Sequence, residues 1–149
     1  MSEPSIHASA VLIGARAMLI QGPSGSGKSR LAWSLLQAAA QGVLPFARLV
    51  ADDRTHVEAV HGRLLVRPAP ALAGLIELRG LGLRRVPHEA VAVAVLVVEL
   101  DSSDGARLPQ TEAQRAMIAG VTLPRLAVAP GNDPLPLVLA LRQTPEAAG

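Results

Sequence analysis

The chain has 149 residues, a formal net charge of +2 and 50% hydrophobic residues, so we expect one domain with a core and not a disordered chain. The absence of cysteine excludes disulfides and thiolate metal sites, and two aromatic side chains provide no platform for stacking bases of a nucleic acid. The longest apolar run, residues 90–98, is too short to span a bilayer, and the first residues do not resemble a signal peptide, so we expect a soluble cytoplasmic protein.

Apolar segments at residues 9–13 and 17–20 predict two strands, and a glycine-rich octapeptide follows them. Residues 22–29 match the whole phosphate-binding loop pattern G-x-x-x-x-G-K-[ST]. Leucine and alanine then recur at helical spacing through residues 31–39, with a stop near 40–42. Because backbone amides of such a loop point at one place before a helix, we expect the following residues to bind nucleotide phosphates: Gly22, Pro23, Ser24, Gly25, Ser26, Gly27, Lys28 and Ser29.

Two residues of this loop carry specific expectations. Lys28 would reach the β- and γ-phosphates of ATP, and the Ser29 hydroxyl would bind Mg²⁺. Lys28 is also the only lysine among 14 basic residues, in a chain that uses arginine at every other basic position. The alternative is a chance match on a glycine-rich surface turn, which the flanking strand and helix disfavour.

An acidic pair, Asp52-Asp53, ends the apolar segment 47–51. We expect that segment to be a strand adjacent in the sheet to the phosphate-loop strand. In phosphate-loop enzymes an acidic residue at such a strand end holds Mg²⁺, and a second carboxylate can take a proton from an attacking hydroxyl. A turn that simply begins with two aspartates is the structural alternative.

The middle of the chain predicts a hairpin at residues 55–60 and 63–66, a short strand at 75–78 and a long central strand at 90–100. Between the last two lies a glycine loop next to Arg79, which could bring a guanidinium group to a phosphoryl group in transfer. On composition alone, a solvent-exposed arginine in a turn is the better interpretation.

The last third predicts a helix from Glu112 to about Ala119, because Thr111 and Gln114 resemble a capping box. A short strand at 126–128 and a closing helix at 135–143 follow, and the tail from about 144 is expected to be disordered. Together the elements predict an α/β fold over 1–149 as a single domain, with a mixed sheet, hairpins and few helices.

Four histidines remain. His7 precedes the first strand and could relay a proton beside a carboxylate, although an exposed and idle side chain is the simpler interpretation. The other three, at positions 56, 61 and 88, have no metal-ligand spacing and are interpreted as surface residues.

In this order, His7, residues 22–29, residues 49–53 and residues 77–82 resemble the catalytic domain of HPr kinase/phosphorylase. The resemblance extends from His7 to Leu100. It implies a phosphate-loop domain similar to phosphoenolpyruvate carboxykinase and a kinase that uses ATP and Mg²⁺. The expected partner is HPr, the phosphocarrier protein of the sugar phosphotransferase system, which the family phosphorylates on a serine. Many members also reverse the reaction by phosphorolysis, and full-length members are hexamers.

Carried over to this chain, the resemblance implies that Asp52 deprotonates the serine and that His7 lies near that carboxylate. It groups Asp52, His7 and Arg79 as catalytic residues and assigns the metal to Ser29, Asp53 and Glu77. Full-length members have a separate N-terminal domain, for which these 149 residues leave no room, so we expect the truncated form found in some proteobacteria. The turn at 129–132 also lacks the arginines that the family usually has there.

Two other classes of function remain open at this stage. A nucleotide-binding regulatory module would bind ATP without phosphorylating a partner. A small-molecule kinase could use the same loop, although the sequence shows no arginine-rich lid of the usual nucleotide-kinase kind.

Overall fold

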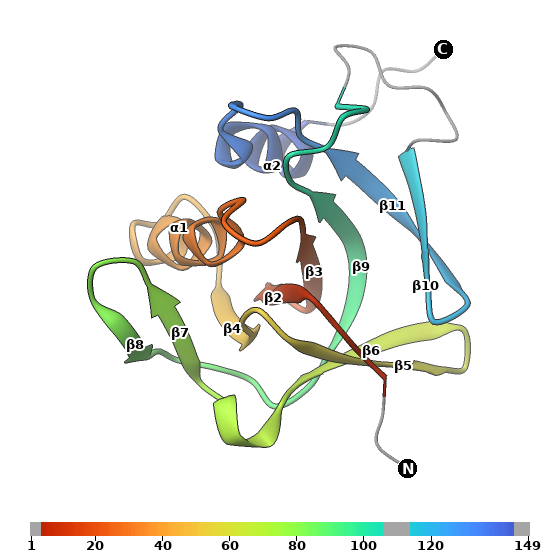
Figure 1. Cartoon of the computed structure of the whole chain (residues 1–149), viewed down its shortest axis with the longest axis horizontal. Coiled ribbons are helices and arrows are strands. Elements are labelled where there is room, and N and C mark those ends of the chain that lie inside the picture. Colours follow the sequence, from red (N-terminus) through yellow and green to blue (C-terminus); the bar gives the residue numbers. More distant parts are fainter. Residues whose placement is uncertain (1–3, 106–113, 145–149) are drawn as a thin grey trace.

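The computed structural model describes residues 4–105 and 114–144, which form a branched β-sheet with two α-helices (Figure 1). The strands are β1 (Ser5–Ile6), β2 (Ala8–Ile13), β3 (Arg16–Gln21), β4 (Ala47–Ala51), β5 (Thr55–Val60), β6 (Arg63–Pro68), β7 (Leu75–Leu78), β8 (Gly82–Arg85), β9 (Ala92–Glu99), β10 (Arg115–Ile118) and β11 (Val121–Ala127). The helices are α1 (Lys28–Ala40), α2 (Pro134–Gln143) and a short 3₁₀ turn, η1 (Pro70–Leu72).

Strand β9 is the centre of the sheet, as its long apolar sequence predicts. The main path runs β1-β5-β6-β9-β3-β2-β4, and β11 adds to β9 as a branch that carries β10. The first half of β9 pairs antiparallel with β6, while its second half pairs parallel with both β3 and β11. Because residues of β9 pack into the cores on both faces of the sheet, the strand needs a continuous apolar run and not an alternation of apolar and polar residues.

Each face of the sheet has its own hydrophobic core. Helices α1 and α2 cover one face, where Leu35 and Val138 meet Ile20 and Val98. On the opposite face, neighbouring residues of the same strands point the other way and pack against β5, β6, β10 and β11. Because successive side chains of a strand alternate between faces, two apolar residues in a row supply both cores.

The expected helix from Glu112 to Ala119 is wrong where the structure describes it. Residues 115–118 form β10, which pairs antiparallel with β11 through a turn at Ala119 and Gly120, both with positive φ. Ile118 is buried in the second core, so tertiary packing overrides the local helix signal. The residues of the proposed capping box before Gln114 lie outside the described part of the chain.

Other elements agree with the sequence or extend it. The strand expected at 126–128 is the end of the longer β11, and α2 begins after Asp133, whose carboxylate accepts the Leu135 amide. The glycine loop after Arg79 is shorter than expected, since residues 82–85 form β8 and pair with β7 as a separate two-stranded sheet. The tail beyond residue 144 lies outside the described residues. No helix in the described ranges is long and apolar enough to cross a membrane.

Strand β4 is not next to β3, contrary to expectation. Strand β2 lies between them and pairs antiparallel with each, so β3 and β4 run parallel and end at the same edge of the sheet. At that edge the start of β2 sits between the two carboxyl ends. Three segments distant in sequence therefore converge: the loop after β3, the aspartates after β4 and the residues that open β2.

Candidate functional site

The loop between β3 and α1 folds tightly around its glycines. Gly22 has a φ of 154°, and a Cβ there would lie 2.5 Å from Ser26 Oγ and 3.0 Å from Leu100 Cβ, so only glycine fits. Gly27, with a φ of 100°, caps the helix without a side chain. The Ser26 amide donates to the Pro23 carbonyl at 3.0 Å and closes the turn.

Lys28 folds back over this loop. Its ammonium group donates to the carbonyl oxygens of Gly22 at 2.9 Å and Pro23 at 3.1 Å, and the residue is only 5% exposed. Among the described residues no carboxylate pairs with it. A buried cation held by two neutral carbonyls is available to an anion that arrives at the mouth of the loop.

Asp52 is the most heavily bonded carboxylate of the site. Its Oδ1 accepts hydrogen bonds from Ser29 Oγ at 2.6 Å and Ser9 Oγ at 2.9 Å, and its Oδ2 accepts the Glu77 amide at 2.9 Å. The residue is 8% exposed. All three donors are neutral, so the negative charge is oriented and solvated without being cancelled by a cation.

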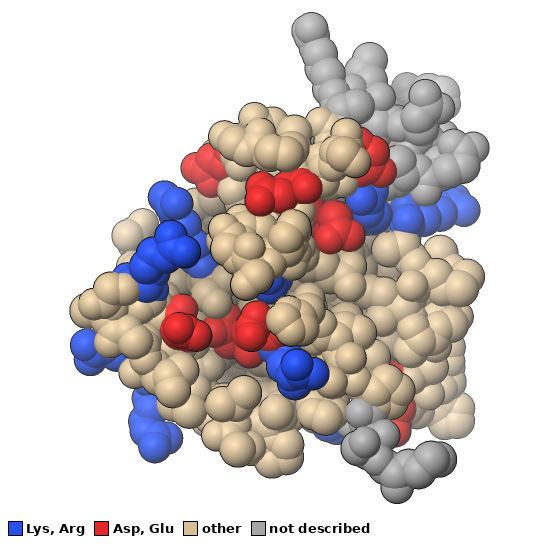
Figure 2. All heavy atoms as spheres, in the orientation of Figure 1, with Lys and Arg blue, Asp and Glu red and all other residues tan. Residues whose placement is uncertain are grey.

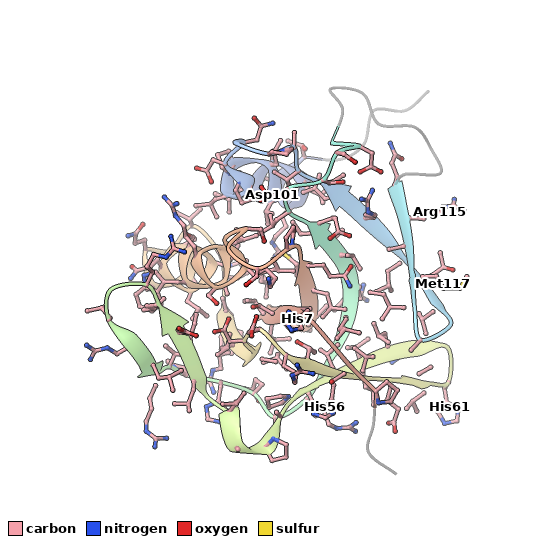
Figure 3. All side chains as sticks on the ribbon, viewed as in Figure 1. His7, His56, His61, Asp101, Arg115 and Met117 are labelled. Atoms are coloured by element: carbon pink, nitrogen blue, oxygen red, sulfur yellow. The ribbon has the colours of Figure 1, made fainter. Side chains whose placement is uncertain are left out.

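Asp53 points to solvent, on the other side of the same turn. Its φ of 66° lies in the left-handed region, which turns its side chain away from that of Asp52. Its Oδ1 is 4.0 Å from His7 Nδ1, and the two side chains are 64% and 60% exposed. Figure 3 shows His7 near the middle of the view at the start of β2, and the carboxylate that it approaches is that of Asp53, whereas the resemblance implied Asp52.

The hairpin β7–β8 reaches the site through its backbone. Glu77 contributes its amide to Asp52, while its carboxylate has no hydrogen bond or ion pair within the described ranges. Arg79 is exposed at the turn of the hairpin, where Gly80 has a positive φ. The structure therefore brings His7, Lys28, Ser29, Asp52 and Asp53 together, places Glu77 next to them by its main chain, and leaves Arg79 on an adjacent exposed turn.

The residues present suit Mg²⁺ only in company with phosphates. Among residues 4–105 and 114–144 no group of three or more His, Asp or Glu side chains is arranged to hold a metal ion. The Ser29 hydroxyl and the Asp52 carboxylate, in contact with each other, supply oxygen donors of the kind Mg²⁺ prefers. Because Mg²⁺ usually takes one or two protein ligands and completes its shell with phosphate oxygens and water, this donor set fits a metal bound with a nucleotide.

Ser9 is the site residue that sequence reasoning missed. It is fully buried on β2 and contacts both aspartates, donating to Asp52 Oδ1 and accepting the Asp53 amide at 3.1 Å. Its signal in the sequence is one polar residue within an otherwise apolar strand. That signal is weak because serine also occurs in strands without taking part in a functional site.

A cluster of ionic contacts lies outside this site, where Arg125 of β11 meets Glu99 at the end of β9 and Asp104 in the turn that follows. Arg125 donates to both carboxylate oxygens of Asp104 at 3.0 Å and to Ser102 Oγ at 3.0 Å, and Ser102 Oγ in turn donates to Asp104. The hydrogen bond from Arg125 lowers the pKa of Asp104 to about 2. Burial raises the pKa of Glu99, against a smaller opposing effect of Arg125.

The fold has been seen before in a solved structure. It is similar to the structure of the HPr(Ser) kinase/phosphatase from Coxiella burnetii, with a TM-score of 0.73 over 95% of this chain and 89% of that one, at 21% identity. Residues 1–134 match the family model of the HPr Serine kinase C-terminal domain. The chain therefore belongs to the HPr Serine kinase C-terminal domain family.

Curated relatives agree with this assignment and are longer. An HPr kinase/phosphorylase from Streptococcus thermophilus is 42% identical over 80 residues, which cover 53% of this chain and 24% of that protein. The enzyme of the same name from Streptococcus sanguinis is 30% identical over 135 residues, covering 83% of this chain and 41% of that protein. The matched part of this chain thus spans about a quarter to two fifths of these relatives.

Proposed function

We propose that this chain is an ATP- and Mg²⁺-dependent serine kinase that phosphorylates an HPr-like phosphocarrier protein. Family membership supports the reaction class. The observation that carries the proposal is the 2.6 Å contact between Ser29 and Asp52, close to the folded-back Lys28. An ammonium group, a hydroxyl and a carboxylate around one glycine-rich loop are the groups that phosphoryl transfer from ATP requires. We further propose that residues 1–149 are one catalytic domain of the phosphate-loop type, similar to phosphoenolpyruvate carboxykinase.

In this proposal residues 22–29 bind the nucleotide. The amides of the loop and of the first turn of α1 donate to phosphate oxygens, and Lys28 exchanges its two carbonyl partners for the β- and γ-phosphates. The exchange favours binding because a charge-assisted bond to phosphate is stronger than a bond to a neutral carbonyl. The helix dipole of α1 adds partial positive charge at the same place.

For the metal we propose Ser29, Asp53 and Glu77 as the residues that hold Mg²⁺, directly or through water. Bound there, Mg²⁺ would neutralise charge that develops on the transferring phosphoryl group. The Ser29 hydroxyl keeps a lone pair for the metal while it donates its proton in a hydrogen bond to the Asp52 carboxylate. Asp52 therefore orients the Ser29 hydroxyl in addition to any role of its own.

The two aspartates divide the remaining work. In the assignment from sequence, Asp52 takes the proton of the acceptor serine and Asp53 supports the metal. The contacts favour a second assignment as well, because Asp52 binds Ser29 whereas the exposed Asp53 lies next to His7, where a protein serine can approach. In either assignment one carboxylate serves the metal side and the other serves the serine.

His7 and Arg79 complete the proposed catalytic set. His7, 4.0 Å from Asp53, would pass the serine proton on to solvent. Arg79 stands on the exposed turn of the β7–β8 hairpin and would reach the transferring phosphoryl group once the protein substrate is bound. Phosphorolysis of the phosphoserine, assembly into a hexamer and a cytoplasmic location are further proposals that rest on the family resemblance.

The decisive experiment mixes the protein with ATP, Mg²⁺ and an HPr-like phosphocarrier and detects phosphoserine by mass spectrometry. The wild type is expected to transfer, Lys28→Ala to lose nucleotide binding, and Asp52→Asn to lose transfer while it still binds nucleotide. An additional Asp53→Asn variant separates the two assignments, since the metal-side variant recovers rate as Mg²⁺ is raised and the base variant does not. Nucleotide binding without any phosphoserine would identify a regulatory module in place of a kinase.

A further inference from the structure

Ser9 stands apart from the other polar residues of the core because its single hydroxyl contacts both aspartates. It lies on β2 and is completely buried. The hydroxyl donates to Asp52 Oδ1 at 2.9 Å and accepts the Asp53 amide at 3.1 Å. A serine hydroxyl has one proton and two lone pairs, so this pair of contacts uses its donor and one acceptor.

The turn that Ser9 contacts adopts an unusual backbone. Asp53 has a φ of 66°, which few residues other than glycine adopt without support. The support comes from β2, where the Ala8 amide donates to the Asp53 carbonyl at 3.1 Å and Ser9 receives the Asp53 amide. The start of β2 therefore binds both polar groups of the Asp53 backbone.

This backbone decides where each carboxylate points. Asp52 turns inward to Ser29, and Asp53 turns outward to His7. Without the Ser9 hydroxyl, the described residues leave Asp52 Oδ1 with Ser29 as its one hydrogen-bond donor and leave the Asp53 amide without an acceptor. Both consequences loosen the acidic pair, whereas the contacts that fold the loop itself, from Ser26 to Pro23 and from Lys28 to Gly22 and Pro23, remain in place.

We propose that Ser9 is a positioning residue for phosphoryl transfer, whose hydroxyl sets the directions of Asp52 and Asp53 at the same time. The inference rests on the proposed function. Because misplacement of a catalytic group by about 1 Å costs on the order of 100-fold in rate, the loss of this hydroxyl acts on the chemical step. ATP binding is spared, since it depends on residues 22–29.

The test compares two variants of Ser9 with a matched control. Ser9→Ala removes the hydroxyl, and Ser9→Cys fills the same space with a much weaker donor and acceptor. The control is Thr55→Val, because Thr55 is equally buried on β5 and its hydroxyl donates to the Ala8 carbonyl at 2.8 Å without contacting either aspartate. Should Ser9→Ala fail to fold, Ser9→Cys decides the question, because it leaves no cavity.

Steady-state kinetics of serine phosphorylation give the first readout. Both Ser9 variants are expected to lower kcat by roughly 10- to 100-fold with KM for ATP within about 2-fold of wild type. Thr55→Val is expected to keep both constants even if its melting temperature falls. A Ser9→Cys enzyme with wild-type kcat overturns the inference, and so does an equal loss of kcat in Thr55→Val.

Amide hydrogen exchange of the free protein, followed by NMR, gives a second readout that needs no activity. The Asp53 amide is expected to exchange about 10-fold faster or more in the Ser9 variants than in Thr55→Val, because it loses its acceptor. If the wild type phosphorylates no serine but this exchange rate rises, the proposed function fails while the positioning by Ser9 stands. Unchanged exchange of the Asp53 amide in the Ser9 variants would refute the positioning itself.

Discussion

Two carboxylates near the carboxyl ends of the sheet strands are bound in opposite ways. Asp52, after β4, accepts hydrogen bonds from two hydroxyls and one amide. Asp104, beyond the end of β9, is bound at both oxygens by the Arg125 guanidinium. Figure 2 shows one face of the molecule, where acidic atoms gather near the middle and again higher up, with basic atoms beside both groups.

The difference concerns whether the negative charge is cancelled. Asp104 has a built-in cation, which is typical of a structural ion pair that ties two segments together. Asp52 has none in the described part of the chain, although Lys28 is buried in the neighbouring loop. An oriented carboxylate and a buried ammonium that do not pair with each other are both available to a ligand that carries phosphates and a metal.

The largest expected effect contrasts the two carboxylates directly. Asp52→Asn should lower kcat for serine phosphorylation by about 10²- to 10⁴-fold, because it removes either the base or the support of the metal ligand Ser29. Asp104→Asn removes the same charge from an ion pair outside the site and should leave kcat within about 3-fold. Steady-state assays of both variants check this. A comparable loss in both would mean that the cluster around Arg125 also serves the reaction.

An effect of intermediate size is expected on the stability of the fold at acidic pH. The pKa of Asp104 is about 2 in the folded protein and 3.8 for an ordinary aspartate, so its ionised form stabilises the fold above pH 3.8. That contribution is lost as the pH falls from 3.8 toward 2. Melting temperatures of wild type and Asp104→Asn should therefore differ at neutral pH and converge near pH 2.

Stability must be compared between wild type and the variant because Glu99 changes the pH dependence of folding stability in the direction opposite to Asp104. Burial raises its pKa, so its protonation stabilises the fold as the pH falls. In the difference between wild type and Asp104→Asn the effect of burial on Glu99 cancels, and what remains is the contribution of Asp104 together with its smaller repulsion on Glu99. A melting difference that stays constant from neutral pH to pH 2 would argue against the ion pair with Arg125.

The smallest expected effect concerns the Ser26 hydroxyl, for which the described residues supply neither hydrogen bonds like those of Asp52 nor a charged partner like that of Asp104. Ser26 Oγ is buried within the loop, close to Gly22, and has no hydrogen-bond partner among the described residues. Ser26→Ala should raise the free energy of unfolding by about 1 kcal/mol, because a buried hydroxyl without a partner costs more than a methyl group. Chemical denaturation of the protein without nucleotide measures it. A loss of stability would show that the hydroxyl has a partner, such as a water molecule.

Local patterns explain how much of this molecule the sequence predicts. The glycines of residues 22–29 indicate the conformation of the loop, and the continuous apolar run of β9 indicates its central position in the sheet. The position of Asp52 close to the loop is also expected from the sequence, because the strand after the loop helix ends at the same edge of the sheet as the strand before the loop. Helix α2 is marked by Asp133 and the prolines around it.

Other features depend on partners that are distant in sequence. Residues 115–118 were expected to be helical and became β10 because β11 pairs with them and the second core takes Ile118. The sequences of β3 and β4 do not show that β2 lies between them, because strands pair through backbone groups that every residue type shares.

By itself the sequence determined the glycine-rich loop, the acidic pair, the family and the central strand, because each depends on residue types at short spacing. Only the tertiary structure decided that β2 separates β3 from β4, that Ser9 meets an aspartate 43 residues away, and that Asp52 and Asp53 face opposite ways. The physical reason is that direction and distance between side chains are set by strand order and by a single backbone angle. Neither is encoded in the local pattern.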